Sequence, residues 1–214
     1  MATVDQAPGP DVVAAPEAGG HAEHPATSTG TSNTKLAIWL FLSSDCLFFG
    51  AFISAYLLYR GRHQTGPTPA KVYSIPFTSV SSFVLLMSSL TMVLALAAIQ
   101  RDDQRRLRIW LLSTALLGGV FIGGQIFEFT EFARKGLALD TNLFGSTFFV
   151  LTGFHGAHVT IGIIWLLSLW GLASQGRLRA GDAEKVEVAG LYWHFVDVVW
   201  IVIFTVVYLI PQSK

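Results

Sequence analysis

The sequence is short of charge, and this shortage sets its class. Only 13% of its 214 residues are Asp, Glu, Lys or Arg, whereas about a quarter is usual in a soluble domain. Positive and negative side chains balance to a formal net charge of zero, and there is no basic block. Nothing therefore points to a nucleic-acid partner. With 52% hydrophobic residues and sixteen phenylalanines, the composition indicates a membrane protein.

Cysteine is nearly absent, and so is any sign of a secretory signal. Cys46 is the only cysteine, which excludes an internal disulfide and a cysteine-based metal site. Residues 1–34 are rich in Ala, Pro, Gly, Ser and Thr and contain no apolar run. They lack the basic start and apolar centre of a signal peptide. Because they cannot bury enough surface to offset their ordering entropy, we expect a disordered cytoplasmic tail.

Long apolar runs fill the rest of the chain, residues 35–214. Five runs each exceed the roughly 20 residues that a helix needs to cross a bilayer. Only closed backbone hydrogen bonding is stable in lipid. The sequence therefore predicts an all-α polytopic membrane protein, a single bundle of five transmembrane helices. The runs are about 36–60, 75–99, 107–133, 143–174 and 190–210.

The orientation follows from basic residues near the ends of these runs. The side that holds the tail carries eight Lys or Arg residues and the opposite side carries six. Since cytoplasmic loops carry an excess of Lys and Arg, we expect a cytoplasmic amino terminus. An odd number of spans then places Lys214 on the outer side.

Seven polar side chains fall at membrane depth, where ionisable groups usually face the bundle interior. Most form i,i+3 pairs, which share a helix face. The seven residues are Asp45, Gln125, Glu128, His155, His158, His194 and Asp197.

Four interpretations of these residues are open. A di-iron bundle needs Glu-x-x-His motifs, and neither is present. A haem-bearing membrane anchor would need axial histidines, which His155 and His194 offer for one haem only. A proton-coupled carrier would titrate Asp45 or Glu128, yet no inverted repeat or broken helix is evident. The pattern favours the fourth, a buried polar network that docks helices, with no catalytic, metal-binding or cofactor-binding residue.

Glycines crowd the third run. Gly119 and Gly123 form a GxxxG step, with Gly118 and Gly124 beside them. Small residues let helix backbones approach closely in lipid. Four glycines within seven residues therefore predict a tightly packed third helix.

Three stretches resemble subunit III of the haem–copper terminal oxidases, the cytochrome c oxidase subunit III family. They are "GGQIFEF", "GSTFFVLTGFHGAHVTIG" and "YWHFVDVVW". The resemblance covers about residues 36–210. It implies the five-helix bacterial form, embedded in the plasma membrane and packed against catalytic subunit I in a complex that includes subunit II. Haems and copper would belong to the partner subunits, and this chain would hold none.

The resemblance also implies a role. In the family, the bundle binds phospholipids and supports assembly of the catalytic subunit and its proton uptake. A cytochrome c oxidase is the main expectation, and a ubiquinol oxidase is the alternative.

The sequence departs from the family's pattern at two places. The family usually has glutamate where "SDCLFF" has Asp45. The link before the last helix lacks the histidine-rich segment of longer members. It retains Arg177 and Arg179, which we regard as candidate contacts for lipid phosphates.

Overall fold

A computed structural model describes residues 30, 32–59, 75–134, 136 and 143–210, and all regular structure within them is helical. All five long helices are long and apolar enough to cross a membrane. The prediction of an all-α bundle of five transmembrane helices is therefore confirmed. The predicted tail lies outside the described residues, apart from Gly30 and residues 32–34. The helices are α1 (Asn33–Tyr59), α3 (Ile75–Gln100), α4 (Gln104–Arg134), α5 (Leu143–Ser174) and α6 (Ala183–Phe204).

The last helix begins seven residues before the expected span. A 3₁₀ turn, η1 (Ala180–Asp182), leads into α6, and a π-helical turn, η2 (Thr205–Leu209), follows it. The first residues of α6 are polar, but Val186 among them is fully buried. Lys35 Nζ, at the start of α1, lies 2.9 Å from Glu187 Oε1. The polar link thus includes a helical turn that packs inward and joins α6 to α1.

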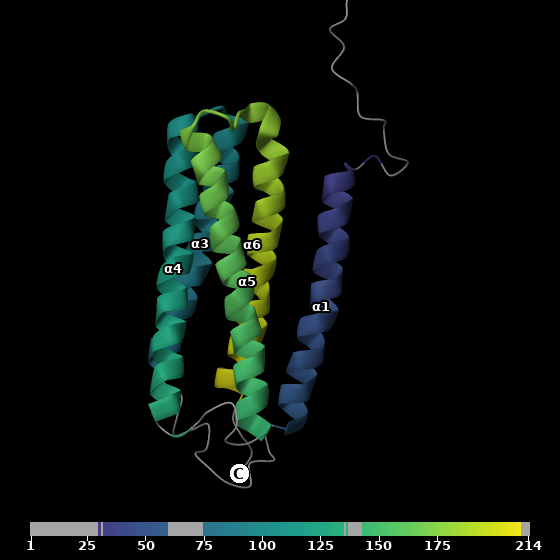
Figure 1. The fold of residues 1–214 in the computed structure, drawn as a ribbon, viewed down its shortest axis with the longest axis vertical. Helices are drawn as coiled ribbons and strands as arrows, with labels where there is room; N and C mark the ends of the chain where they lie inside the picture. The colour runs from purple at the N-terminus through teal and green to yellow at the C-terminus, as the bar shows by residue number, and fades with distance from the viewer. Residues whose placement is uncertain (1–29, 31, 60–74, 135, 137–142, 211–214) are drawn as a thin grey trace, which may run out of the picture.

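Four helices form a compact group, and α1 lies at its side (Figure 1). Within the group α3 packs against α4 and α6, and α5 packs against α4 and α6. Helix α1 contacts only α5 and α6 to any extent. In the most apolar 18-residue stretch of the last span 50% of the residues are buried, whereas 11% are buried in that of α1. Helix α6 is therefore the element around which the others are arranged.

A tight turn joins α3 to α4. Asp102 has φ = 54°, a left-handed conformation that Asp tolerates better than most residues. The Asp103 N–H donates to the Ala98 carbonyl at 3.0 Å, which closes the end of α3. The Asp103 carboxylate accepts the Arg106 N–H at 3.0 Å and caps the start of α4. The turn thus satisfies backbone groups at two helix ends with three residues.

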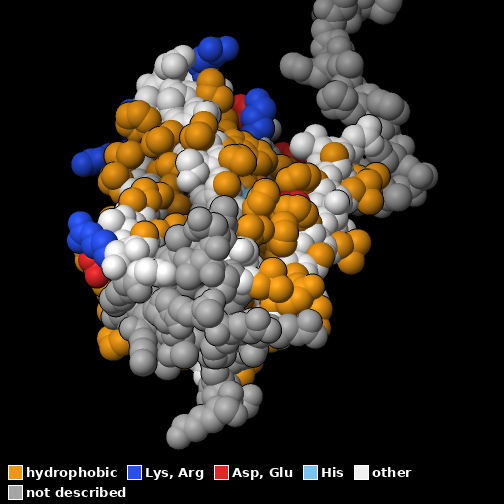
Figure 2. Space-filling view, turned by 60° about the horizontal axis from the view of Figure 1, so that its bottom comes forward, with side chains coloured by type: hydrophobic (Ala, Val, Ile, Leu, Met, Phe, Trp, Pro, Cys, Tyr) orange, Lys and Arg blue, Asp and Glu red, His pale blue; other side chains and the backbone are white. Residues whose placement is uncertain are grey.

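The outer faces of the helices are apolar. Leu40, Leu47, Val80 and Ile126 are all more than 60% exposed. Figure 2 shows hydrophobic side chains over most of the described surface in view, with few charged ones. Such a surface suits a lipid environment, where apolar groups need no burial against protein.

Candidate functional site: the interhelical polar network

Helix α3 presents three serines to α6, and each forms a hydrogen bond with a ring nitrogen. Trp193 Nε1–H donates to Ser88 Oγ at 2.9 Å, and Trp200 Nε1–H donates to Ser82 Oγ at 2.8 Å. Ser89 Oγ and His194 Nδ1 share a hydrogen bond of 2.5 Å. Because hydrogen bonds between helices replace absent hydrophobic drive in lipid, this seam fixes how α6 docks on α3.

The indole ring of Trp193 occupies a slot between two glycines and is fully buried. A Cβ built on Gly118 of α4 would lie 2.6 Å from Trp193 Cη2. One built on Gly162 of α5 would lie 2.9 Å from Cε3 and Cζ3 of the same ring. Only glycine leaves enough room on both sides. One side chain of α6 therefore touches α3, α4 and α5 together.

The GxxxG step has a different place from the one that its sequence suggests. Among the described residues, a Cβ on Gly119 or Gly123 would meet nothing within 4 Å, so neither glycine brings another of the described helices close. Their neighbours face other helices instead. Gly118 faces Trp193 of α6, as described above, and a Cβ on Gly124 would lie 3.0 Å from Ser81 Oγ of α3. The expected tight packing of this helix is present, but it involves Gly118 and Gly124, and the expectation for the GxxxG pair was wrong within this chain.

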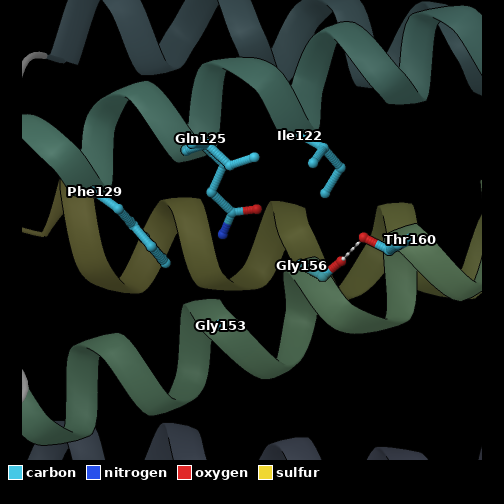
Figure 3. A pocket seen from close by; sticks show the side chains of 7 residues that line it. Ile122, Gln125, Phe129, Gly153, Gly156 and Thr160 are labelled. Carbon is cyan, nitrogen blue, oxygen red and sulfur yellow. Dashed lines mark hydrogen bonds between the residues drawn. The ribbon is translucent and has the colours of Figure 1, made fainter.

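Gln125 joins α4 to α5. Its Nε2 donates to the Thr152 carbonyl at 2.8 Å. The amide lies over the backbone of α5, so that a Cβ on Gly156 would fall 2.8 Å from Gln125 Oε1. Figure 3 shows Gln125 reaching from α4 toward α5, beside a hollow of about 200 Å³ that Gly153, Gly156 and Phe129 also line. The hollow exists because α5 presents glycines there.

Glu128 lies on the same helix but contacts a different neighbour. The Thr78 hydroxyl of α3 donates to Glu128 Oε1 at 2.6 Å, and both side chains are buried. Gln125 and Glu128, three residues apart, therefore reach different helices with these two hydrogen bonds. The pair connects α4 to α5 with one member and to α3 with the other.

Asp45 and His158 join α1 to α5. His158 Nε2 lies 3.5 Å from Asp45 Oδ2, and both side chains are largely enclosed. His158 Nδ1 lies 2.8 Å from the Phe154 carbonyl oxygen. Tyr192 of α6 donates its hydroxyl proton to the His158 carbonyl at 2.9 Å. The Asp45–His158 contact is thus a second polar attachment of the outlying helix α1, besides the Lys35–Glu187 ion pair at its start.

His155 and Asp197 are the two deeply buried ionisable residues without a hydrogen bond in the described part of the chain. His155 is fully buried, and neither of its ring nitrogens has a partner there. Its ring stacks on Trp200 with a centroid separation of 4.9 Å. Asp197 is 3% exposed, and its carboxylate lies close to the Ser89 hydroxyl of α3. Both residues lie in the protein-facing interior of the bundle.

Metal ligands do not gather anywhere in the described residues. No group of three or more His, Cys, Asp or Glu side chains there is placed to hold a metal ion. Arg177 and Arg179 lie between α5 and α6 with exposed side chains. The sequence-predicted polar residues therefore separate into contacts between helix pairs and do not converge on one centre.

The sequence analysis did not identify Ser82, Ser88 and Ser89 of α3 as partners of α6. A signal was available: "SS" occurs at 81–82 and again at 88–89, seven residues apart and hence on one helix face. Serine alone is common in membrane helices, so only its match to Trp193, His194 and Trp200 makes it informative.

The fold and these contacts define a class, a multi-pass membrane protein whose intramembrane polar groups connect its own helices. Comparison with known proteins adds the family. The family model described as cytochrome c oxidase subunit III matches residues 10–211. The chain is 38% identical to cytochrome c oxidase subunit 3 of Bacillus sp. (strain PS3) over 187 residues, which cover 87% of this chain and 90% of the relative.

Of two further relatives, one is named a cytochrome c oxidase subunit and the other a quinol oxidase subunit. Cytochrome c oxidase subunit 3 of Thermostichus vulcanus is 39% identical over 83% of this chain and 87% of its own length. Quinol oxidase subunit 3 of Bacillus subtilis (strain 168) is 36% identical over 88% of this chain and 96% of its own length. The chain belongs to the cytochrome c oxidase subunit III family. It is thus a subunit III of a haem–copper terminal oxidase complex, as the three stretches suggested.

Proposed function

We propose that the chain is an accessory, non-catalytic subunit of a bacterial cytochrome c oxidase in aerobic respiration. The observation that carries this proposal is the use of the intramembrane polar groups: Trp193, His194 and Gln125 bind neighbouring helices of the same chain. Polar side chains that form hydrogen bonds between helices stabilise the bundle. A quinol oxidase is the alternative, because relatives of similar identity carry that name.

The partners and cofactors follow from this role. The bundle packs against catalytic subunit I in a complex with subunit II, and it supports assembly of the catalytic subunit. The haems and copper belong to the partner subunits. Each histidine of the spans contacts groups of this chain, which supports a cofactor-free chain: His155 stacks on Trp200, His158 lies beside Asp45, and His194 bonds to Ser89.

The Asp45–His158 pair is the element through which the chain supports proton uptake by its neighbour. A carbonyl oxygen only accepts hydrogen bonds, so the Phe154 contact requires a proton on His158 Nδ1. His158 Nε2 then faces Asp45 Oδ2. Two lone-pair atoms repel at this distance unless a proton lies on one of them. An acid and an imidazole placed side by side are groups that can pass a proton, and this pair lies between α1 and α5.

Asp45→Asn tests this function, because asparagine keeps the shape of the side chain but cannot ionise. We expect the complex to assemble normally and to lose a modest part of its steady-state oxygen reduction. The loss should grow as pH rises, since protons become scarce. The measurement is oxygen consumption by the purified complex across a pH series, with its subunit content checked by gel.

Asp45→Glu is the matched control, since glutamate is the residue usual in the family at this position. It retains the acid and should keep the wild-type pH profile. An Asn variant with the wild-type profile would leave Asp45 a packing residue. Loss of the chain from the complex in the Asn variant would make Asp45 structural.

The orientation in the plasma membrane rests on the basic residues. The start of α1, the α3–α4 turn and the α5–α6 link lie at one end of the bundle (Figure 1). Eight basic residues belong to that side and six to the other, which favours a cytoplasmic amino terminus. Arg177 and Arg179 would then contact phosphates of the inner leaflet. A reporter active only outside the cytoplasm should work when fused after Lys214, and one active only in the cytoplasm should not.

A further inference from the structure

Helices α3 and α4 enclose a hollow of about 180 Å³ close to the turn that joins them, apart from the polar network. Its apolar wall includes Leu94 and Ala97 of α3 and Trp110 of α4. At the turn, the hollow is lined by Arg101 and Arg106. It is therefore apolar at one end and cationic at the other.

One guanidinium at this turn has no acidic partner, although both acids of the turn have partners. Arg106 Nε lies 3.3 Å from Asp103 Oδ2. Asp102 accepts a hydrogen bond from the Gln104 side chain at 3.1 Å. No ion pair among the described residues includes Arg101, whose side chain is exposed. Since the N–H groups of a guanidinium match the oxygens of a carboxylate, Arg101 is suited to an acidic group from elsewhere.

The amino-terminal residues 1–34 contain charge of the complementary sign. They include four acidic residues and no Lys or Arg. One of the acids directly precedes two valines, in the sequence Asp11-Val12-Val13. A carboxylate beside two adjacent apolar side chains matches a hollow that is cationic at one end and apolar at the other.

This segment is close enough along the chain to reach the hollow. The start of α1 and the α3–α4 turn lie at the same end of the bundle (Figure 1). Helix α1 packs against α5, and α5 packs against α4, so the turn is two helix spacings from α1, or roughly 20 Å. Twenty residues separate Val13 from Asn33, where α1 begins. An extended chain of this length spans up to about 65 Å.

We propose that the segment Asp11–Val13 docks in this hollow, with the Asp11 carboxylate on Arg101 and the valines against Ala97 and Trp110. The docked segment ties the amino terminus to the α3–α4 hairpin, on the other side of the bundle from α1. The proposal limits the disorder expected of the tail to the residues on either side of this segment. It goes beyond the role in the oxidase, because it concerns two parts of this chain alone. The site is separate from the two arginines of the α5–α6 link.

Photo-crosslinking in the purified complex tests the docking. Ala15, two residues after Val13, is replaced by the photoreactive amino acid benzoylphenylalanine, and the crosslinked peptides are identified by mass spectrometry. At low ionic strength we expect crosslinks to residues 94–110 of the same chain. High salt should reduce their yield, because it screens the attraction between Asp11 and Arg101. The absence of these crosslinks, or crosslinks only to a partner subunit or to a second copy of the chain, would overturn the proposal.

Two variants change the hollow in different ways. Arg101→Gln removes the unpaired charge, and Ala97→Leu fills the hollow without changing any charge. Arg105→Gln is the matched control, because Arg105 is exposed on the same turn but does not line the hollow. The crosslink yield should fall roughly fivefold in both variants and stay unchanged in the control. An equal yield in all four proteins, or an equal fall in the control, would contradict docking at the hollow.

An exchange of the two charges tests the contact between Asp11 and Arg101 itself. Arg101→Glu places a second acid beside Asp11, so the crosslink should be lost. The double variant Asp11→Arg with Arg101→Glu restores opposite charges and should recover most of the yield. Because Arg101 is exposed, the complex should assemble in both cases, and a gel of its subunits checks this. A double variant that assembles but forms no more crosslink than Arg101→Glu alone would overturn the proposed contact.

Discussion

Gly118→Val is expected to destabilise the bundle by about 3 kcal/mol, at the upper end of the usual cost of overpacking a core. A Cβ at this position would lie 2.6 Å from Trp193 Cη2 and 3.2 Å from Ile163 Cγ1. The indole ring cannot move away, since Gly162 touches its other side and Ser88 holds its N–H. The strain must therefore separate α4 from α6. The loss of stability is measured by heating the detergent-solubilised complex and recording the temperature at which this chain is released.

Gly119→Val is the control for this substitution. It adds the same side chain to the same helix one residue later, where a Cβ would meet nothing within 4 Å. Because glycine is a poor helix former, we expect the unfolding temperature to stay the same or rise slightly. In addition, Trp193→Phe should relieve part of the defect of Gly118→Ala, because the smaller ring lacks the atoms that the new Cβ contacts. If valine at 118 and valine at 119 destabilised the bundle equally, the claim that Trp193 lies in a slot between Gly118 and Gly162 would be contradicted.

Trp200→Ala is expected to be at least as damaging, with a loss of about 3–5 kcal/mol. The Trp200 ring stacks on His155 and meets Phe121 edge-on at 4.8 Å. Its N–H binds Ser82 of α3. Truncation would leave a cavity against α4 and α5 and leave the Ser82 hydroxyl without this donor. Unfolding of the purified complex in a mixed-micelle denaturant series measures the change in free energy.

Two further variants separate packing from hydrogen bonding at Trp200. Trp200→Phe keeps most of the ring but removes the donor, so we expect a loss of only about 1 kcal/mol. Trp39→Ala removes a tryptophan that is 55% exposed on α1, and it should change the unfolding free energy of the chain little. If alanine at 39 were as harmful as alanine at 200, the inward-facing packing of Trp200 would be contradicted.

The helices themselves were predictable because membrane thickness fixes their length. Four of the five runs match their helices within about three residues at each end. The start of α6 was not predictable from apolarity alone. Val186 is buried although it lies in a polar segment, so the apolar run alone did not include it.

The rotation of each helix about its axis was harder to predict. In water a polar face identifies the outside of a helix, but in lipid the outer face is as apolar as the core. Only the polar residues report the inward direction, and they identified Gln125, His155 and Asp197 as interior. They could not show that Gly118 faces Trp193 while Gly119 faces outward. Nor could they show that members of an i,i+3 pair bind different helices, since this depends on how the neighbours are arranged.

The most direct test of the account is purification of the complex through an affinity tag after Lys214, from membranes of cells that express the chain natively. We expect the catalytic subunit to elute with this chain, and the eluate to show haem absorption and to reduce oxygen with reduced cytochrome c as donor. When the chain is then separated from its partners, all of the haem should remain with them. A folded, isolated chain that carries stoichiometric haem, or an eluate without any oxidase subunit, would contradict the account.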